Sequence, residues 1–304
     1  MRAFIVITVF TGLFSLLGYL AELHPLFELT VHFKLQYLTV SCCALLFFLF
    51  KREKIWALVS LCCLSINMAV ILPWYWPQAQ VLTTADIRIL ELNVWSRSYK
   101  YSQVISLVRE VKPNIAVFLE VNRHWRAALE TLQESYPYHI SAKEIMIYSQ
   151  LPLRHGEINQ FSMGKQFIAA SVKLNGKELQ VVAAHLHNPI RTKGLKMRNQ
   201  QLVALSEYVT RLTTPVVVVG DLNTTMWSPY YQRFARQAGL RNARYGFGVL
   251  PTWPGFMPLI PIDHFLASPA IQVVNLHRGA DVGSDHLPLI AELAIPDSAF
   301  LKRR

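Results

Sequence analysis

The sequence predicts a mixed α/β domain of about 220 residues that follows three membrane-spanning helices. Three observations carry this prediction. Three long apolar runs lie before residue 81, and from Thr83 onward short β-rich runs alternate with amphipathic helical patterns. The run Val216–Val219 consists of β-branched residues, which is typical of a strand buried on both faces, and it leads into Gly-Asp-Leu-Asn at residues 220–223.

The apolar runs cover about residues 3–21, 31–50 and 55–72, and each is long enough to cross the hydrocarbon core of a bilayer. Lys34 lies in the second run, where we expect its side chain to extend to the interface. The third run ends in the aromatic cluster at residues 73–77, which is typical of a membrane interface. One such run could be a signal peptide, but three could not. We therefore expect residues 1–80 to be a membrane anchor and the lipid bilayer to be a partner.

Basic residues predict the orientation of these spans. Residues 51–54 read Lys-Arg-Glu-Lys between the second and third spans, and Arg2 precedes the first. Because basic loops stay in the cytoplasm, the amino terminus and this loop are predicted to be inside. Residues 81–304 then follow an odd number of spans. We expect this domain on the non-cytoplasmic face of a multi-pass bacterial inner or plasma membrane protein.

Charge favours an anionic partner for the globular part. The chain carries a net charge of +11, of which the ionisable residues before residue 81 contribute +2 and the remainder +9. A basic field attracts nucleic acid, phosphorylated metabolites or lipid head groups without distinguishing them. All four cysteines lie in the apolar first quarter, as two adjacent pairs. That placement is typical of apolar packing rather than of a disulfide framework or a metal site.

The pattern of the globular part predicts nine strands and four helices, which fit one α/β or α+β domain. An Asn-Gly pair at residues 175–176 between two strands predicts a hairpin, so part of the sheet should be antiparallel. The strands are predicted at residues 87–93, 115–120, 145–149, 167–174, 179–185, 216–221, 262–266, 271–275 and 289–293. The helices are predicted at residues 101–111, 123–133, 195–212 and 230–238.

Polar side chains stand at the ends of six of these apolar strands. Isolated residues of this kind are usually turn formers. Six strands that each present a carboxylate, an amide or an imidazole at one end point instead to a site positioned by a rigid scaffold. These residues are Asn93, Glu120, His185, Asp221 with Asn223, Asp263, and the pair Asp285 and His286.

The region from Ile87 to Leu293 resembles the endonuclease/exonuclease/phosphatase superfamily, of which DNase I is a member. The resemblance is carried by Leu-Asn-Val-Trp at 92–95, the strand-ending Glu120 and His185, Gly-Asp-Leu-Asn at 220–223, Ile-Asp-His at 262–264 and Gly-Ser-Asp-His at 283–286, all in the family's order. In one departure Leu119 precedes Glu120, where many members have Gln. The resemblance implies a four-layer α-β-β-α sandwich of two mixed β-sheets whose strand ends meet at one site.

The resemblance also implies metal-assisted hydrolysis of a phosphoester. Carboxylate and amide oxygens suit Mg²⁺ or Mn²⁺. Glu120 is implied as the principal metal ligand, supported by Asn93 and Asp285. His286, oriented by Asp263, and Asp221 are alternative bases for the attacking water, and the sequence does not separate them. Asn223 is implied to donate to phosphoryl oxygens, and His185 to contact the scissile phosphate or assist the leaving group.

The identity of the ester stays open at this stage. The charge favours a phosphodiesterase of nuclease type, with possible nucleic acid substrates, over a phospholipid or phosphate-monoester hydrolase. A catalytically silent membrane binding protein is an alternative from another class, but it should have lost site residues, and none is missing. A transport component should carry strongly polar groups deep in its spans. Apart from His32, Lys34 and Gln36 near one end of the second run, only Ser, Thr and Asn67 are present there.

Overall fold

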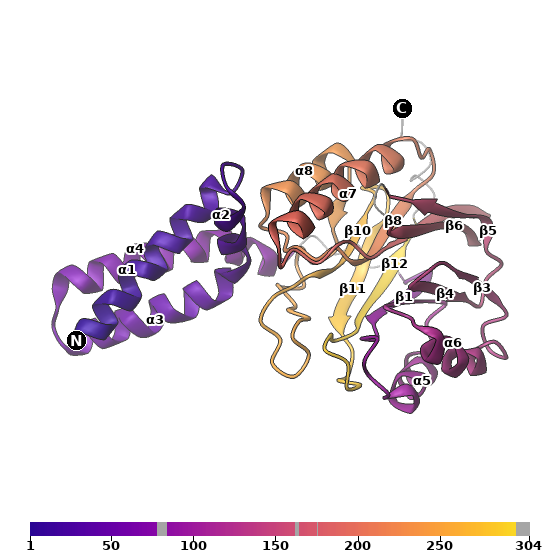
Figure 1. Cartoon of the computed structure of the whole chain (residues 1–304), viewed down its shortest axis with the longest axis horizontal. Helices are drawn as coiled ribbons and strands as arrows, with labels where there is room; N and C mark the ends of the chain where they lie inside the picture. Colours follow the sequence, from indigo (N-terminus) through magenta and orange to yellow (C-terminus); the bar gives the residue numbers. More distant parts are fainter. Residues whose placement is uncertain (78–83, 162–163, 175, 296–304) are drawn as a thin grey trace.

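A computed structural model describes residues 1–77, 84–161, 164–174 and 176–295. Two six-stranded sheets stack on each other, helices cover both outer faces, and three long helices extend from one side (Figure 1). The predicted class, a four-layer α-β-β-α sandwich preceded by three apolar helices, is confirmed. The predicted hairpin joins antiparallel strands at residues 174 and 177; its Asn175 lies outside the described residues.

The first sheet has the strand order β11-β12-β1-β2-β4-β3, in which β1 and β2 are parallel and the other neighbours antiparallel. Helices α5 and α6 cover its outer face. Its strands are β1 (Ile87–Asn93), β2 (Ile115–Leu119), β3 (Tyr138–Ser141), β4 (Ile145–Ser149), β11 (Gln272–Arg278) and β12 (Leu289–Ala294). Its helices are α5 (Tyr101–Val111), α6 (Arg123–Leu129) and the 3-10 turn η4 (Glu130–Leu132).

The second sheet has the order β5-β6-β7-β8-β10-β9, in which β7 and β8 are parallel and the other neighbours antiparallel. Helices α7 and α8 cover its outer face. Its strands are β5 (Arg154–Gln160), β6 (Gln166–Leu174), β7 (Lys177–Ala184), β8 (Val216–Asp221), β9 (Arg241–Asn242) and β10 (Asp263–Ala267). Its helices are α7 (Thr192–Thr210) and α8 (Pro229–Gln237).

Strand β8 shows why its run of valines is needed. Val217 and Val219 point into the core between the two sheets, whereas Val216 and Val218 pack beneath α7 and α8. All four side chains are fully buried, which confirms the prediction of a strand covered on both faces. Successive residues of a strand face opposite sides, so a continuous apolar run is required wherever both sides are covered.

Three strands were not predicted, and all three are at sheet edges. Strand β5 is exposed along nearly its whole length and carries polar residues, β3 is half exposed, and β9 has two residues. An edge strand needs no apolar alternation because little of it is buried, so periodicity does not reveal it. The nine predicted strands are all present within a few residues of their predicted bounds.

The helices before the sandwich include three that are long and apolar enough to cross a membrane, within Arg2–Leu20, Pro25–Phe50 and Lys54–Tyr75. The second begins at Pro25, before the predicted start at residue 31, because Pro occupies its first position and the His24 side chain caps it. The elements are α1 (Arg2–Leu17), η1 (Gly18–Leu20), α2 (Pro25–Thr30), η2 (Val31–Phe33), α3 (Lys34–Phe50), α4 (Lys54–Ile71) and η3 (Leu72–Tyr75).

Two residues of this region pack inward, unlike the prediction. Lys34 is buried between helices and donates from Nζ to the carbonyl oxygen of Ser15 at 3.2 Å, instead of extending outward. Trp74 is buried and stacks on Tyr245 of the sandwich with ring centroids 4.2 Å apart. Its aromatic neighbours Tyr75 and Trp76 keep the exposure expected of an interfacial cluster.

A buried ion pair joins the apolar helices to the sandwich. Glu28 in α2 and Arg198 in α7 are both fully buried and form a hydrogen-bonded ion pair. Ser228 donates to the same carboxylate at 3.0 Å and Asn199 at 3.3 Å, so the Glu28 oxygens have partners from two parts of the sandwich. Arginine is usually exposed on a helix, but the surrounding elements enclose Arg198 completely.

We expect Glu28→Ala to destabilise the full-length chain, because Arg198 would be left as an uncompensated buried charge. Breaking such a pair costs about 3–5 kcal/mol, which corresponds to a melting temperature lower by about 10 °C. Thermal unfolding of the detergent-solubilised chain measures this.

The matched control is Glu22→Ala, which removes another ion pair between the helical region and the sandwich. Glu22 and Arg233 form that pair with side chains 53% and 42% exposed, and exposed pairs contribute no more than about 1 kcal/mol. An equal loss of stability in the two variants would contradict the assigned importance of the buried pair.

Candidate functional site

The predicted site residues meet because of how the strands run. Parallel strands β1 and β2 end at the same edge of the first sheet, and β7 and β8 end at the corresponding edge of the second. Strands β12 and β10 run antiparallel to these and begin there. The edge therefore carries Asn93 (end of β1), Glu120 (after β2), His185 (after β7), Asp221 (end of β8), Asp263 (start of β10), and Asp285 and His286 (before β12).

A cavity of about 860 Å³ opens at this edge, and we call it the edge cavity. Two of the predicted residues, Asn93 and Asp263, lie behind its wall and hydrogen-bond to residues that form it. The other six predicted residues line it: Glu120, His185, Asp221, Asn223, Asp285 and His286.

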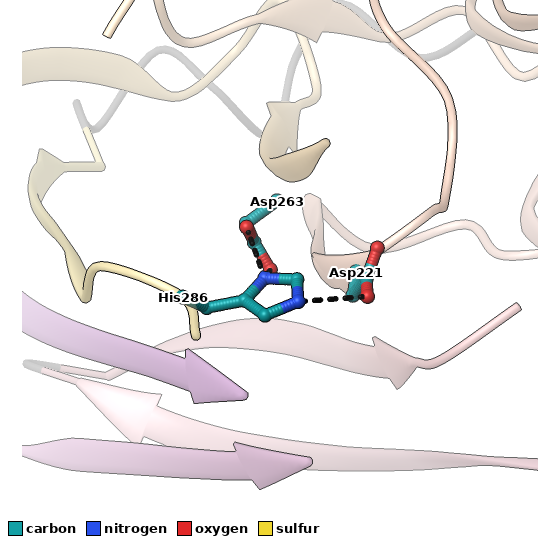
Figure 2. Close-up of side chains that lie close together, drawn as sticks. All are labelled: Asp221, Asp263 and His286. Atoms are coloured by element: carbon teal, nitrogen blue, oxygen red, sulfur yellow. Dashed lines mark hydrogen bonds and ion pairs between the residues drawn. The ribbon is translucent and has the colours of Figure 1, made fainter. Parts of the chain in front are cut away.

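His286 is held by Asp263 and faces Asp221 (Figure 2). Its Nδ1 lies 3.0 and 2.8 Å from the two Asp263 oxygens, and its Nε2 lies 3.8 Å from Asp221 Oδ2. Burial alone would lower the pKa of His286, but the Asp263 carboxylate outweighs it and raises that pKa to about 10. Asp263 thus fixes the ring orientation and favours the imidazolium, as carboxylate–histidine pairs do.

Asp221, Asp263 and His286 also bring ligand-type atoms within 4.8 Å of one another. The contacts between Asp263 and His286 account for these short distances without a bound cation. Both Asp263 oxygens are engaged by His286 Nδ1, so only His286 Nε2 and Asp221 face the cavity. A positively charged imidazole at that position opposes a metal ion there.

His185 has a carboxylate partner that the sequence did not predict. Its Nδ1 lies 3.1 Å from Glu144 Oε1, and Lys165 Nζ lies 2.7 Å from the same oxygen. Burial raises the pKa of Glu144, but His185 and Lys165 outweigh burial and lower it to about 2. Glu144 lies in the turn between β3 and β4, with no strand-end signal to mark it. The site therefore holds two histidine–carboxylate pairs, one from each side.

Asp221 Oδ2 is the atom on which these groups converge. His185 Nε2 lies 3.7 Å from it and His286 Nε2 3.8 Å. The side-chain amides of Asn93 and Asn223 each donate to it at 3.3 Å. Burial, then the neighbouring Asp263, raises the pKa of Asp221 to about 6, while His286 and His185 counteract both. Asp221 is thus a buried carboxylate whose pKa lies close to neutrality, which suits proton transfer.

Backbone geometry around Asp221 explains the neighbouring residues. Gly220 has φ +137°, and a Cβ there would lie 2.0 Å from the carbonyl oxygen of Ala184. The glycine thus permits the close approach of strand β7. Asn223, with φ +49°, donates from its side chain to the Leu186 carbonyl at 3.0 Å and so links the ends of β7 and β8.

Glu120 is positioned by short-range hydrogen bonds. Its Oε2 accepts from the backbone N–H and the hydroxyl of Ser96, both at 3.1 Å, and its Oε1 accepts from Asn93 at 3.2 Å. Burial by itself would raise the pKa of Glu120. His185 and these hydrogen bonds outweigh burial, so the pKa is lowered and the carboxylate is held ionised.

The residues on this side of the edge cavity fit a hard divalent cation. Asp285 lines the same cavity, and its Oδ1 is buried with no hydrogen-bond partner among the described residues. Burial, to which the negative Glu120 adds, raises the pKa of Asp285. An ionised carboxylate beside a second one with an orphaned oxygen is the donor set that Mg²⁺ or Mn²⁺ prefers. Asn93 Oδ1 already accepts from the Trp95 N–H at 3.0 Å, so only its second lone pair could join them.

The segment after β8 is held from the apolar helices. Arg198, paired with Glu28, donates from Nη1 to the carbonyl oxygen of Asn223 at 2.9 Å. His32 of η2 lies 3.0 Å from the hydroxyl of Thr225 through its Nδ1. The sequence did not mark Glu28 or His32 as site residues, because their importance depends on contacts with a distant part of the chain.

His264, which the sequence treats as a strand residue, has a structural role. Its ring is fully buried, donates from Nε2 to the Thr224 carbonyl at 2.7 Å and accepts from Arg244 at 3.2 Å through Nδ1. Burial, and then Arg244, lowers the pKa of His264 to about 3, so the ring is neutral. Through its hydrogen bond to Thr224, His264 supports the segment that follows Asn223.

Two stacked mixed sheets bring carboxylates, amides and paired histidines to one edge, a set of groups suited to the hydrolysis of a phosphoester. The sequence profile described as the Endonuclease/Exonuclease/phosphatase family matches residues 90–286. The chain belongs to that family, whose members are hydrolases of phosphoester bonds. The predicted family is thereby confirmed. No curated protein matches the chain.

Solved structures with the same fold cover the sandwich. One is an endonuclease/exonuclease/phosphatase from Beutenbergia cavernae DSM 12333, with 20% identity over 69% of this chain and 72% of that one and a TM-score of 0.58. D. rerio TDP2, complexed with a single-strand DNA product, is 18% identical; the match covers 68% of this chain and 98% of that one, with a TM-score of 0.58. The human Nocturnin catalytic domain, with bound sulfate, is 15% identical; the match covers 71% of this chain and 97% of that one, with a TM-score of 0.59.

The low pKa of Glu144 predicts a pH-dependent contribution to stability. The pKa in the folded state, about 2, is below the ordinary value of 4.5, so the contribution is present above pH 4.5 and is lost as the pH falls toward 2. We expect Glu144→Gln to have a lower melting temperature than the parent chain at pH 6. This difference in melting temperature should be smaller at pH 3, where the parent chain has lost part of the contribution. The same variant should lower kcat by about tenfold to a hundredfold, because His185 loses its partner.

Glu110→Gln is the matched control, because Glu110 is exposed on α5. It should follow the pH dependence of the parent chain. A constant difference between Glu144→Gln and the parent from pH 6 to pH 3 would contradict the predicted linkage.

Proposed function

We propose that the chain is a divalent-metal-dependent phosphodiesterase that uses Mg²⁺ or Mn²⁺. The observation that carries this proposal is the meeting of two histidine–carboxylate pairs, Asp221 and the Glu120–Asp285 carboxylates around one cavity. One side of the cavity offers oxygen ligands, and the other offers N–H donors and a proton acceptor. Hydrolysis of a phosphoester needs both.

Glu120 and Asp285 would hold the metal ion, with Asn93 supporting Glu120. When bound, the ion supplies charge neutralisation to the phosphoryl oxygens. Glu120 is kept ionised, and Asp285 Oδ1 has no donor among the described residues, so both carboxylates are available to the ion.

Asp221 is the group that we assign as acceptor of the proton from the attacking water. His286 was the alternative base, but Asp263 favours its protonated form, which cannot accept a proton. Asp221, with a pKa of about 6, is ionised at neutral pH and is close enough to neutrality to act as a base. His286 in this assignment donates from Nε2 to a phosphoryl oxygen.

His185 and Asn223 complete the assignment. The Nε2 of His185 faces the cavity while Glu144 engages its Nδ1, so His185 can contact the scissile phosphate and give a proton to the leaving oxygen. Asn223 lines the cavity, and its amide lies 3.3 Å from Asp221 Oδ2. The other N–H of this amide donates to the Leu186 carbonyl, so the longer contact with Asp221 would be exchanged for one with a phosphoryl oxygen as negative charge develops.

The proposal predicts that the full-length chain hydrolyses bis-p-nitrophenyl phosphate or plasmid DNA with Mg²⁺ or Mn²⁺ and that EDTA stops it. Glu120→Gln and Asp285→Asn should each reduce turnover by at least about a hundredfold at the metal concentration that saturates the parent chain. Both should also weaken Mn²⁺ binding, measured by titration and electron paramagnetic resonance.

Asp281→Asn controls for charge in the loop of Asp285, because Asp281 is exposed and accepts from the Gly283 N–H. Its turnover should match the parent chain. Undiminished turnover in Glu120→Gln, or hydrolysis that persists in EDTA, would contradict the assignment of Glu120 and Asp285 as ligands of a catalytic metal ion.

We also propose that residues 1–80 anchor the chain in a bilayer and that residues 81–304 form the catalytic domain on the non-cytoplasmic side. Three apolar helices and the basic residues 51–54 support this orientation. Alkaline phosphatase fused after the last residue should be active in a bacterial cell. The same enzyme inserted after Lys51 should be inactive. The reverse pattern would place the catalytic domain in the cytoplasm.

Two observations bear on the ester. The basic charge of the chain favours nucleic acid, so nuclease-type cleavage is the first candidate. The lysines that line the edge cavity are Lys143 and Lys165, however, and Glu144 pairs with Lys165. Leu29 and Phe33 of the apolar helices also line the cavity, and they favour a second candidate, a phosphoester with an apolar chain.

A further inference from the structure

An apolar crevice lies on the helices that precede the sandwich, and we call it the helix crevice. Its volume is about 360 Å³. Its walls come from α1, α2, η2 and α3, so it lies between helices that are long and apolar enough to cross a membrane. Its lining residues are Phe14, Leu29, Thr30, Phe33, Gln36 and Tyr37.

The helix crevice adjoins the edge cavity. Leu29 and Phe33 line both, so one pair of apolar side chains forms the wall that the two spaces share. In Figure 1, α2 lies at the end of the helices that faces the sandwich. The lining therefore changes from charged in the edge cavity to apolar in the helix crevice across this shared wall.

The surroundings of this junction are apolar and accessible. Phe14 and Phe33 are 39% and 42% exposed, although both are aromatic. Phe256 and Met257 lie in the loop before β10 and are exposed as well. Gln36 donates to the Leu259 carbonyl at 3.0 Å, which ties that loop to α3 beside the helix crevice. Exposed apolar side chains on the helices and on the loop tied to them are typical of a membrane or ligand contact.

We propose that the helix crevice binds the apolar chain of a membrane phosphoester whose phosphate group occupies the edge cavity. The inference rests on the proposed phosphodiesterase function and deepens it. A ligand that fills both spaces must combine an anionic phosphate with an apolar chain. Nucleic acid offers the first and lacks the second, whereas a bilayer lipid has both and can enter sideways from the membrane.

Two esters that differ only in their chains test this inference: methyl and dodecyl 4-nitrophenyl phosphate, both of which release nitrophenolate. The full-length chain is assayed with Mg²⁺ in digitonin, a detergent without an alkyl chain that could fill the helix crevice. Because each buried methylene group strengthens binding by about fourfold, kcat/KM should favour the dodecyl ester by at least about tenfold. This ratio should fall at least about fivefold in Phe33→Ala.

Phe14→Ala tests the helix crevice without touching the edge cavity, because Phe14 lines only the former of the two. It should reduce the same ratio. Phe50→Ala is the matched control, since Phe50 is an exposed aromatic residue at the far end of α3 and lines neither space. A ratio that stays the same in Phe14→Ala and Phe33→Ala would overturn the inference, because the preference would then come from partitioning into detergent.

A binding measurement separates this failure from failure of the proposed function. Dodecyl phosphate with a diazirine at the end of its chain should crosslink to residues 14–37 upon illumination, and Phe14→Ala should reduce the yield severalfold. Crosslinking there without hydrolysis of either ester would remove the phosphodiesterase proposal and leave the binding site. Hydrolysis of the methyl ester or plasmid DNA, with no crosslink to these residues, would remove the binding site and leave the proposed function.

Discussion

The buried carboxylate of Asp221 sets the main constraint on this structure. It lies at the end of β8, almost without solvent, and a buried charge requires donors to compensate its lost hydration. The donors come from both sheets, Asn93 from the first and Asn223 from the second, and one imidazole from each side lies within ion-pair distance. Each imidazole in turn has its own carboxylate, so the site is a connected network. Its geometry depends on the stacking of the two sheets.

The apolar helices also balance a buried charge that supports the site. The loop after β8 carries Asn223 and is held by Arg198, whose charge is buried and balanced by Glu28. The helices therefore contribute to the site in two ways. They complete the electrostatics of the loop, and through Leu29 and Phe33 they form a wall of the edge cavity. An anchor that only tethered the domain would need neither contact.

Local patterns predicted most of the fold because they record burial. Strand β8 is covered on both faces and needs a continuous apolar run, so its bounds were predicted correctly. The edge strand β5 is exposed, and nothing in its sequence distinguishes it from a loop. Asn93, Glu120 and Asp221 could be found because polar residues at the ends of apolar strands stand out. Glu144 could not, since it lies in a turn where a carboxylate is ordinary.

The sequence by itself determined nine of the twelve described strands, the four helices of the sandwich and the eight residues placed at the strand ends, because these depend on short-range periodicity and on motifs in a fixed order. Only the tertiary structure decided which charges meet. Glu28 and Arg198 are 170 residues apart, and each alone is typical of a solvated surface. Their pairing follows from the position of α2 beside the sandwich, as does the apolar wall that Leu29 and Phe33 form beside the carboxylates. Such contacts have no local signature, because burial of a charge is favourable only when the fold supplies its partner.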